Sequence, residues 1–161
     1  MVLAGQILGK AAVYDGKNAV QTQSYGAEAR GTVAKSEVII SKNRIGFPAV
    51  RKCDILIAMS QEALDKNLKD LKENGLLLID NSLVKNVPQV KAKVYEIPAT
   101  ALSEKTFGQK TYANMIMLGA LTKIIKLVSQ DSMEKAVKDS FAEKAADANL
   151  QAYKKGTELI A

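Results

Sequence analysis

The apolar positions of this chain follow two periods, and each period predicts its own kind of element. In residues 1–14 they recur at three- and four-residue steps, which predicts a helix that ends at Asp15-Gly16. Residues 19–23 alternate between apolar and polar side chains, and residues 37–41 form a short run rich in β-branched residues. Both patterns are typical of strands. The chain is therefore predicted to begin with a helix and two strands.

The middle of the chain predicts a parallel sheet. The strand patterns at residues 54–59, after the initial Asp54, and at residues 76–79 are apolar without alternation. Between them residues 60–74 follow a helical pattern, with Gly75 at the expected stop. A shorter strand is predicted at residues 93–97. Strands that are apolar on both faces and joined by a helix are typical of a covered parallel sheet. The predicted fold class is therefore α/β, a three-layer α/β/α domain with a mainly parallel sheet.

Helices are predicted to predominate in the last third of the chain. Residues 98–108 predict a short helix, and residues 111–128 predict the most apolar helix of the chain. This apolar helix leaves little polar surface, so we expect it to cover the sheet or to be covered by another subunit. Amphipathic helices are predicted over residues 131–144 and 145–159. No repeat or long linker interrupts the chain, so residues 1–161 are predicted to form one domain.

Two glycines shape the packing expected of the first helix. Gly5 and Gly9 lie four residues apart and therefore share one face of the helix. Because neither carries a side chain, we expect this face to lie close against a neighbouring element.

The stretch of residues 21–41, which is flanked by strand patterns and has a polar segment between them, holds the most unusual chemistry of the chain. Its glycines allow backbone angles that a Cβ forbids, or let another surface come close. The guanidinium of Arg30 is a rigid, permanently charged fork that suits a carboxylate or a phosphate. A plain connecting loop in which Arg30 pairs with Glu28 is the simpler alternative. The candidate residues are Ser24, Tyr25, Gly26, Glu28, Arg30 and Gly31.

A second candidate position follows the strand at residues 76–79. Asp80, Asn81 and Ser82 stand at the carboxyl end of that strand, where open α/β sheets bind ligands. Such residues also form ordinary turns, and the sequence leaves both interpretations open.

Composition excludes several kinds of catalytic and metal site. The chain has no histidine, which excludes a Ser-His or Cys-His nucleophile pair and a histidine-ligated metal. Its single cysteine, Cys53, excludes an internal disulfide and an iron–sulfur cluster held by this chain alone. No apolar run reaches the length of a membrane span and no leader pattern is present, so we expect a cytoplasmic protein without a membrane partner.

The net charge of +6 is concentrated in the middle third of the chain. Residues 85–126 carry seven lysines against two glutamates. Nucleic-acid binding is one explanation of a basic region, but no basic cluster is interleaved with the five Tyr and three Phe of the chain. We therefore favour a solvated lysine surface and expect no nucleic-acid partner.

Several segments follow one another in a fixed order. They are Gln23-Ser-Tyr-Gly-Ala-Glu-Ala-Arg-Gly31, Lys35-Ser-Glu-Val-Ile-Ile-Ser41, Ala58-Met-Ser-Gln-Glu-Ala-Leu64, Ile97-Pro-Ala-Thr100 and Ala113-Asn-Met-Ile-Met-Leu-Gly119. This ordered set resembles the gamma subunit of the 2-oxoacid:ferredoxin oxidoreductases, over nearly the whole chain. The resemblance is to the 2-oxoglutarate enzymes rather than the pyruvate enzymes. One departure is Thr32, where the family pattern has a second glycine.

The resemblance implies a subunit that is not catalytic alone. Its complex would oxidatively decarboxylate a 2-oxo acid, with 2-oxoglutarate favoured, using coenzyme A to form acyl-coenzyme A and reduce ferredoxin, or run in reverse. The implied partners are alpha, beta and delta subunits and ferredoxin. The implied cofactors are thiamine diphosphate with Mg²⁺, [4Fe-4S] clusters and coenzyme A, none held by this chain alone. The alternatives are a pyruvate or branched-chain version of the complex, and a stand-alone α/β module that binds a nucleotide or coenzyme.

The resemblance also suggests roles for particular residues. The candidates from Ser24 to Gly31 would form a loop at a subunit interface or on the substrate side. Asn114 places an amide in the first turn of an apolar helix, which requires hydrogen-bond partners. A capping or turn bond would satisfy it, and the resemblance favours a bond to a partner subunit. Similar subunits begin with a strand and a Gly-Gly-Gln-Gly-type turn, so we expect this first strand and glycine-rich loop to be missing here.

Overall fold

The computed structural model describes residues 1–25 and 34–161. These form two compact units, one made of residues 1–50 with 114–161 and the other of residues 51–113. Helices accompany a three-stranded parallel sheet, which confirms the predicted α/β class. The prediction that residues 1–161 make a single domain stays a prediction.

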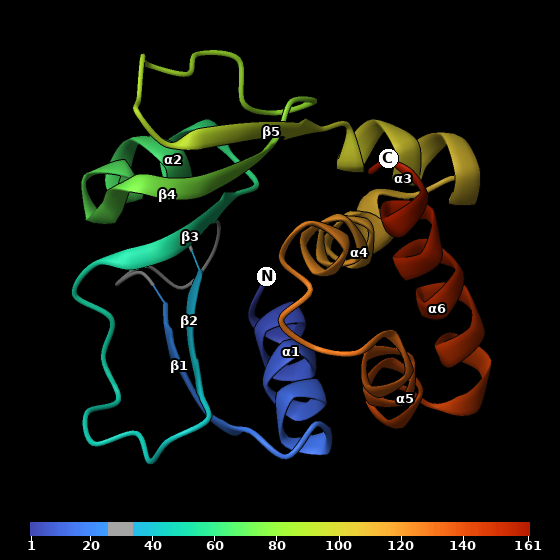
Figure 1. Cartoon of the computed structure of the whole chain (residues 1–161). Helices are drawn as coiled ribbons and strands as arrows, with labels where there is room; N and C mark the ends of the chain where they lie inside the picture. The colour runs from blue at the N-terminus through green and yellow to red at the C-terminus, as the bar shows by residue number, and fades with distance from the viewer. Residues whose placement is uncertain (26–33) are drawn as a thin grey trace. The chain divides into compact units, whose positions relative to one another are not determined.

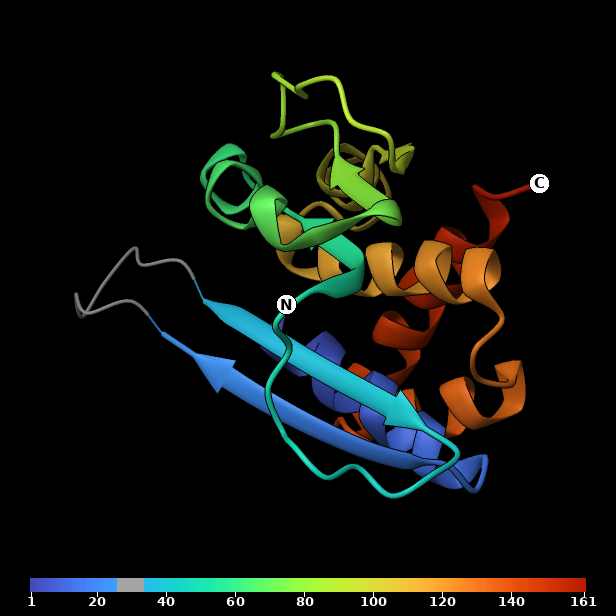
Figure 2. The ribbon, with the colours of Figure 1, turned by 60° about the vertical axis from the view of Figure 1, so that its left-hand side comes forward.

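The first unit combines a β-hairpin with helices. Its two strands run antiparallel (Figure 2). Their register runs from Asn18 opposite Ser41 to Ser24 opposite Lys35. Helix α1 lies between this hairpin and α5, and α6 follows beside α5 (Figure 1). The predicted first helix and both predicted strands are therefore confirmed. The elements are α1 (Val2–Tyr14), β1 (Asn18–Ser24), β2 (Lys35–Ser41), α4 (Ala113–Ile125), α5 (Gln130–Asp139) and α6 (Glu143–Glu158).

Helix α1 packs directly on β2 at a glycine. A Cβ on Gly5 would overlap the hydroxyl of Ser36 and would lie 3.2 Å from a methyl carbon of Val38. A Cβ on Gly9 would meet only the Cβ of Ala19, at an ordinary 3.9 Å. The predicted close approach of this helix is therefore confirmed at Gly5, whereas Gly9 has room for a side chain.

Helices α4 and α6 approach each other through two glycines. A Cβ on Gly119 would overlap the carbonyl oxygen of Tyr153, and a Cβ on Gly156 would overlap that of Ile116. The hydroxyls of Thr122 and Tyr153 share a buried hydrogen bond of 2.9 Å across the same contact. Burial raises the pKa of Tyr153, although its bond to Thr122 opposes that effect. The two helix backbones therefore touch, and the contact has no space for larger residues.

The carboxylate of Asp15 ties the end of α1 to the start of α5. One oxygen, Oδ1, accepts hydrogen bonds from the hydroxyls of Ser132 (2.5 Å) and Ser129 (2.7 Å), and Oδ2 accepts from the N–H of Ser129 (2.6 Å). These bonds, with Ser132 first, lower the pKa of Asp15 below its usual value. The sequence predicted a helix end at this aspartate but not its contact with residues more than a hundred positions away.

This geometry predicts a pH-dependent contribution to stability. Because the pKa of Asp15 is lowered by folding, its contribution is present above the ordinary aspartate pKa and is lost as the pH falls through the folded-state value. We expect Asp15→Asn to reduce the free energy of unfolding by about 1 kcal/mol at neutral pH. Urea unfolding at neutral and acidic pH measures this difference, which should shrink in acid. Asp147→Asn, at an exposed carboxylate of α6, should change little, and an acid-independent loss in Asp15→Asn would contradict the prediction.

The second unit is built on the parallel sheet, in the strand order β3-β4-β5. One buried cluster joins α2 and the segment after β4 to this sheet, with Leu64 of α2 against Ala58, Leu77, Ile79 and Val84. The short helix predicted at residues 98–108 is confirmed, and it ends at Gly108 with a left-handed φ of 72°. The elements are β3 (Cys53–Ala58), α2 (Gln61–Asn67), the 3₁₀ turn Leu68–Asp70, β4 (Leu71–Asp80), β5 (Lys93–Ile97), α3 (Ala99–Phe107) and the 3₁₀ turn Lys110–Tyr112.

The helix predicted over residues 60–74 was too long. It ends at Asn67, and after one 3₁₀ turn the strand β4 begins at Leu71, so that Gly75 lies inside a strand. The register between β3 and β4 shifts at this point, and a Cβ on Gly75 would stand 2.8 Å from the carbonyl oxygen of Asp54. Gly75 therefore serves a bulge between strands rather than a helix stop.

The C-terminal helices also have different ends from those predicted. The apolar helix predicted over residues 111–128 starts after a 3₁₀ turn and ends at Ile125, because Lys126 adopts a left-handed φ of 47°. The next helix starts at Gln130 because the side chain of Ser129 accepts the N–H of Ser132 as an N-cap. Short capping interactions thus set boundaries that hydrophobic periodicity alone did not predict.

Candidate functional site

The structure places two of the hairpin candidates and leaves four outside its described residues. Ser24 is the last residue of β1, opposite Lys35, and its side chain is exposed. Tyr25 follows it with 64% of its surface exposed. Such exposure of an aromatic ring suits contact with another molecule. The candidates that lie outside the described residues are Gly26, Glu28, Arg30 and Gly31.

Asn114 is the second residue of α4 and is half-buried. Its Oδ1 accepts the N–H of Met115 at 2.9 Å, so the local bond that the sequence analysis named as one alternative is present. Its Nδ2 donates to no other atom in the part of the chain that the structure describes. One side of the amide is therefore satisfied within the helix, and the donor side has no partner among residues 1–25 and 34–161.

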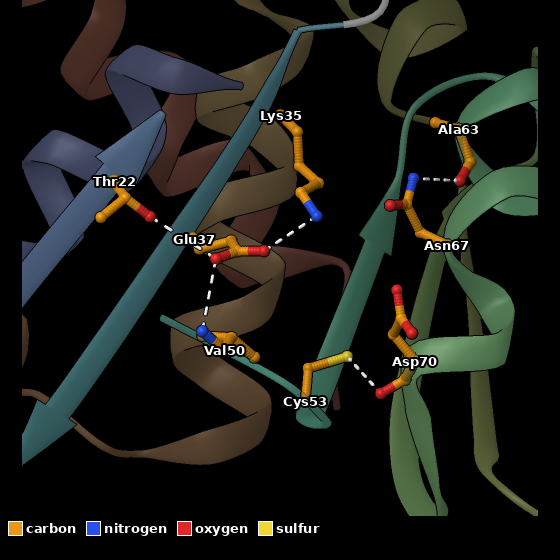
Figure 3. A network of polar contacts seen from close by, with 8 residues as sticks. All are labelled: Thr22, Lys35, Glu37, Val50, Cys53, Ala63, Asn67 and Asp70. Atoms are coloured by element: carbon orange, nitrogen blue, oxygen red, sulfur yellow. Dashed lines mark hydrogen bonds and ion pairs between the residues drawn. The ribbon is translucent and has the colours of Figure 1, made fainter. Parts of the chain in front are cut away.

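A polar network joins the two strands of the hairpin to Val50 (Figure 3). Its centre is the carboxylate of Glu37, which binds the ammonium of Lys35 at 2.8 Å and accepts from the hydroxyl of Thr22 at 3.5 Å. The N–H of Val50 donates to the same carboxylate at 3.4 Å. Partial burial would raise the pKa of Glu37. The hydrogen bonds from Lys35 and Val50 and the positive charge of Lys35 outweigh this effect, so the pKa of Glu37 is lowered.

The network fixes the segment that leaves β2, which we call the connector, residues 42–50. Glu37 and Lys35 lie on the face of the hairpin opposite the one that Ser36 turns toward α1, because side chains alternate along a strand. The connector turns back across the hairpin (Figure 2), and Val50 reaches Glu37 (Figure 3). Both stems of the candidate loop and the connector are thereby joined through one carboxylate.

The second candidate position, after β4, is a structural junction. Asp80 is fully buried, and its Oδ2 accepts both the N–H of Thr100 (3.0 Å) and its hydroxyl (2.5 Å). Its Oδ1 accepts the N–H of Ser82 at 3.0 Å. Asp80 therefore caps the first turn of α3 from the end of β4, which agrees with the turn alternative rather than with a ligand site.

Sequence reasoning missed the roles of Glu37, Asp15 and Thr100. Each depends on a partner far away in sequence or on an exact strand register. For Glu37 the usable signal was Lys35 two residues earlier, since residues i and i+2 of a strand share a face. No comparable pattern pointed to Asp15 or Thr100.

A metal or iron–sulfur site on this chain would need several ligating side chains close together. Within residues 1–25 and 34–161, no group of three or more His, Cys, Asp and Glu side chains is placed to hold a metal ion. Cys53 is half-buried, with its Sγ 3.5 Å from the carbonyl oxygen of Asp70 (Figure 3). One thiol does not fit an iron–sulfur cluster, which takes four. No helix among the described residues has the length and apolar character needed to cross a membrane.

Comparisons with known proteins match almost the entire chain. The sequence model of the family described as pyruvate ferredoxin/flavodoxin oxidoreductase matches residues 1–159. The 2-oxoglutarate synthase subunit KorC of Methanocaldococcus jannaschii is 49% identical over 99% of this chain and 87% of its own length. The KorC subunit of Methanothermobacter thermautotrophicus is 44% identical over 99% of this chain and 88% of its own.

A solved structure gives the same result for the fold. The gamma subunit of a keto/oxoacid ferredoxin oxidoreductase from Geobacter sulfurreducens superposes with a TM-score of 0.86 and is 40% identical. The superposition covers 99% of this chain and 92% of that subunit. The likeness agrees with the resemblance that the ordered sequence segments indicated. This chain belongs to the pyruvate ferredoxin/flavodoxin oxidoreductase family.

Proposed function

We propose that this chain is the gamma subunit of a 2-oxoacid:ferredoxin oxidoreductase whose substrate is 2-oxoglutarate. The observation that carries the proposal is the 49% identity to a 2-oxoglutarate synthase subunit across 99% of the chain. The complex decarboxylates the 2-oxo acid oxidatively in the presence of coenzyme A, forms the acyl-coenzyme A and transfers electrons to ferredoxin, or runs in reverse. This chain acts as a subunit and not as a catalyst alone.

The cofactors are proposed to belong to other subunits. Thiamine diphosphate with Mg²⁺ supplies the carbanion chemistry of decarboxylation, and the [4Fe-4S] clusters carry electrons. The single cysteine and the absence of histidine agree with an assignment of these groups to alpha, beta and delta partners. Ferredoxin is the proposed electron acceptor. Residence in the cytoplasm stays a prediction that fractionation of native cells would test.

The candidate loop is the part of this subunit that we propose to meet its partners or the substrate side. Support comes from the exposed ring of Tyr25 and from the Glu37 network that holds the two stems of the loop. The available donor of Asn114 is proposed to complete the contact with a partner subunit. Ser24, Gly26, Glu28, Arg30 and Gly31 are assigned to the same surface by sequence.

Purification of the complex from its native cells tests the assignment. We expect the chain to co-purify with alpha- and beta-type subunits in equal amounts. The complex should reduce ferredoxin faster with 2-oxoglutarate than with pyruvate or branched-chain 2-oxo acids. An isolated monomer that binds a nucleotide tightly by calorimetry would favour the stand-alone module instead. A preference for pyruvate would retain the family and change the substrate.

Arg30→Ala tests the proposed loop. We expect the complex with this variant to lose about tenfold or more in turnover or in subunit affinity, because the permanently charged guanidinium, which suits a carboxylate or a phosphate, is removed. Arg30→Lys should recover only part of the loss, since an ammonium keeps the charge without the fork. Circular dichroism should show an unchanged fold. Wild-type turnover and assembly in Arg30→Ala would instead leave the loop with a purely structural role.

A further inference from the structure

Two cations of the connector, Lys42 and Arg44, have no carboxylate partner among the described residues. Residues 38–53 include two lysines and two arginines but no carboxylate. Lys42 and Arg44 are exposed, and among the described residues neither makes an ion pair or a hydrogen bond through its side chain. The carboxylate of Glu37, which lies close to the connector's other end, already binds Lys35. Both side chains are therefore exposed, and neither pairs with a carboxylate of the described residues.

The backbone between these two cations is held in place. The N–H of Asn43 donates to the hydroxyl of Ser41 at 3.0 Å, and the carbonyl of Asn43 accepts from Nδ2 of Asn18 at 3.1 Å. Lys42 and Arg44 flank this clamped residue. A recognition surface on a fixed backbone loses less conformational entropy on binding than one on a free loop. The backbone that carries the two cations is therefore held in place before a partner binds.

The chemistry of this turn suits a protein carboxylate better than a free phosphate. Phosphate sites usually supply several backbone N–H donors at a helix start or a glycine-rich turn. Here the N–H groups of Asn43 and Val50 already donate to Ser41 and Glu37. The turn also presents side-chain cations, and an arginine fork matches carboxylate geometry and is enriched at protein interfaces.

We infer that Lys42 and Arg44, presented by the clamped turn at Asn43, form a docking surface for an acidic face of another subunit of the complex. This inference rests on the proposed function, because it needs a neighbouring subunit. Exposed interfacial charges act mainly on association and its salt dependence. The two cations together are worth about tenfold in affinity at low ionic strength.

The test uses the complete complex, co-expressed with either the wild-type chain or the Lys42→Gln/Arg44→Gln variant. Mass photometry at nanomolar concentration gives the dissociation constant of this subunit at about 50 mM and about 500 mM NaCl, which are low and high relative to physiological screening. We expect about tenfold weaker binding of the variant at low salt and a much smaller difference at high salt. Lys105→Gln/Lys144→Gln is the matched control, because both lysines are exposed and unpaired within the described residues.

Further variants and results decide whether Lys42 and Arg44 act as a docking surface. The charge-conserving Lys42→Arg/Arg44→Lys variant should bind like wild type, and equal affinity of the glutamine variant and wild type would overturn the inference. Normal assembly with an increased KM for coenzyme A would also overturn it, because the cations would then serve an anionic substrate. Failure of the wild-type chain to join any oxidoreductase complex would overturn the proposed function itself, and the docking surface with it.

Discussion

Gly119→Ala should reduce the free energy of unfolding by about 3 kcal/mol, even though alanine is the better helix former. The added Cβ would overlap the carbonyl oxygen of Tyr153 and would stand 3.0 Å from the Cα of Gly156. Both obstacles are backbone atoms, which cannot turn aside as a flexible side chain can. Helix α4 would have to move away from α6, and the buried bond between Thr122 and Tyr153 would lengthen.

Gly9→Ala is the matched control, since it makes the same change in the middle of another helix. Its Cβ would meet only the Cβ of Ala19, at 3.9 Å, so the gain in helix propensity should stabilise the protein by up to about 1 kcal/mol. Urea unfolding, with helix content followed by circular dichroism, measures both variants. The two substitutions should differ in sign. A loss of similar size in both variants would show that backbone contact between α4 and α6 is not the cause.

The sequence predicted the order and type of most elements because their hydrophobic periods are strong. Residues 1–14 and 93–97 were correct within a residue, since a glycine or a proline marks their ends. The prediction was wrong at residues 60–74, where Leu68 and Leu71 continued the helical spacing. These leucines instead pack from a 3₁₀ turn and a strand against the sheet cluster. A helical period and a helix–turn–strand junction place apolar residues similarly, so only tertiary contacts separate them.

The candidate site was predicted only in part, for a different physical reason. Gly and Arg in a polar segment are visible in a sequence, and the ordered segments identified the family. The contacts of Glu37 are not visible, because they need the pairing of Thr22 with Glu37 and the return of the connector to bring in Val50. Such partners lie 13 to 15 residues away in sequence and become neighbours only after folding.

Asp80→Ala should destabilise the second unit by about 3 kcal/mol. The substitution removes a buried carboxylate that accepts three hydrogen bonds, and it leaves the N–H and hydroxyl of Thr100 without an acceptor in a site with 4% exposure. The start of α3 would lose its cap, so the helix should open more often. Hydrogen exchange of α3 amides, together with urea unfolding, measures both effects.

Asp54→Ala provides the comparison for Asp80, because it removes a carboxylate from a strand of the same sheet. The Asp54 side chain is 81% exposed and pairs with Lys72 in solvent, so its loss should cost no more than about 0.5 kcal/mol. Asp80→Asn should fall between the two, since an amide retains one acceptor oxygen for α3. If Asp80→Ala and Asp54→Ala cost the same and α3 exchange is unchanged, the cap does not hold β4 to α3. If the order Asp80→Ala, Asp80→Asn, Asp54→Ala is observed, the carboxyl end of β4 acts in this subunit as an anchor for α3.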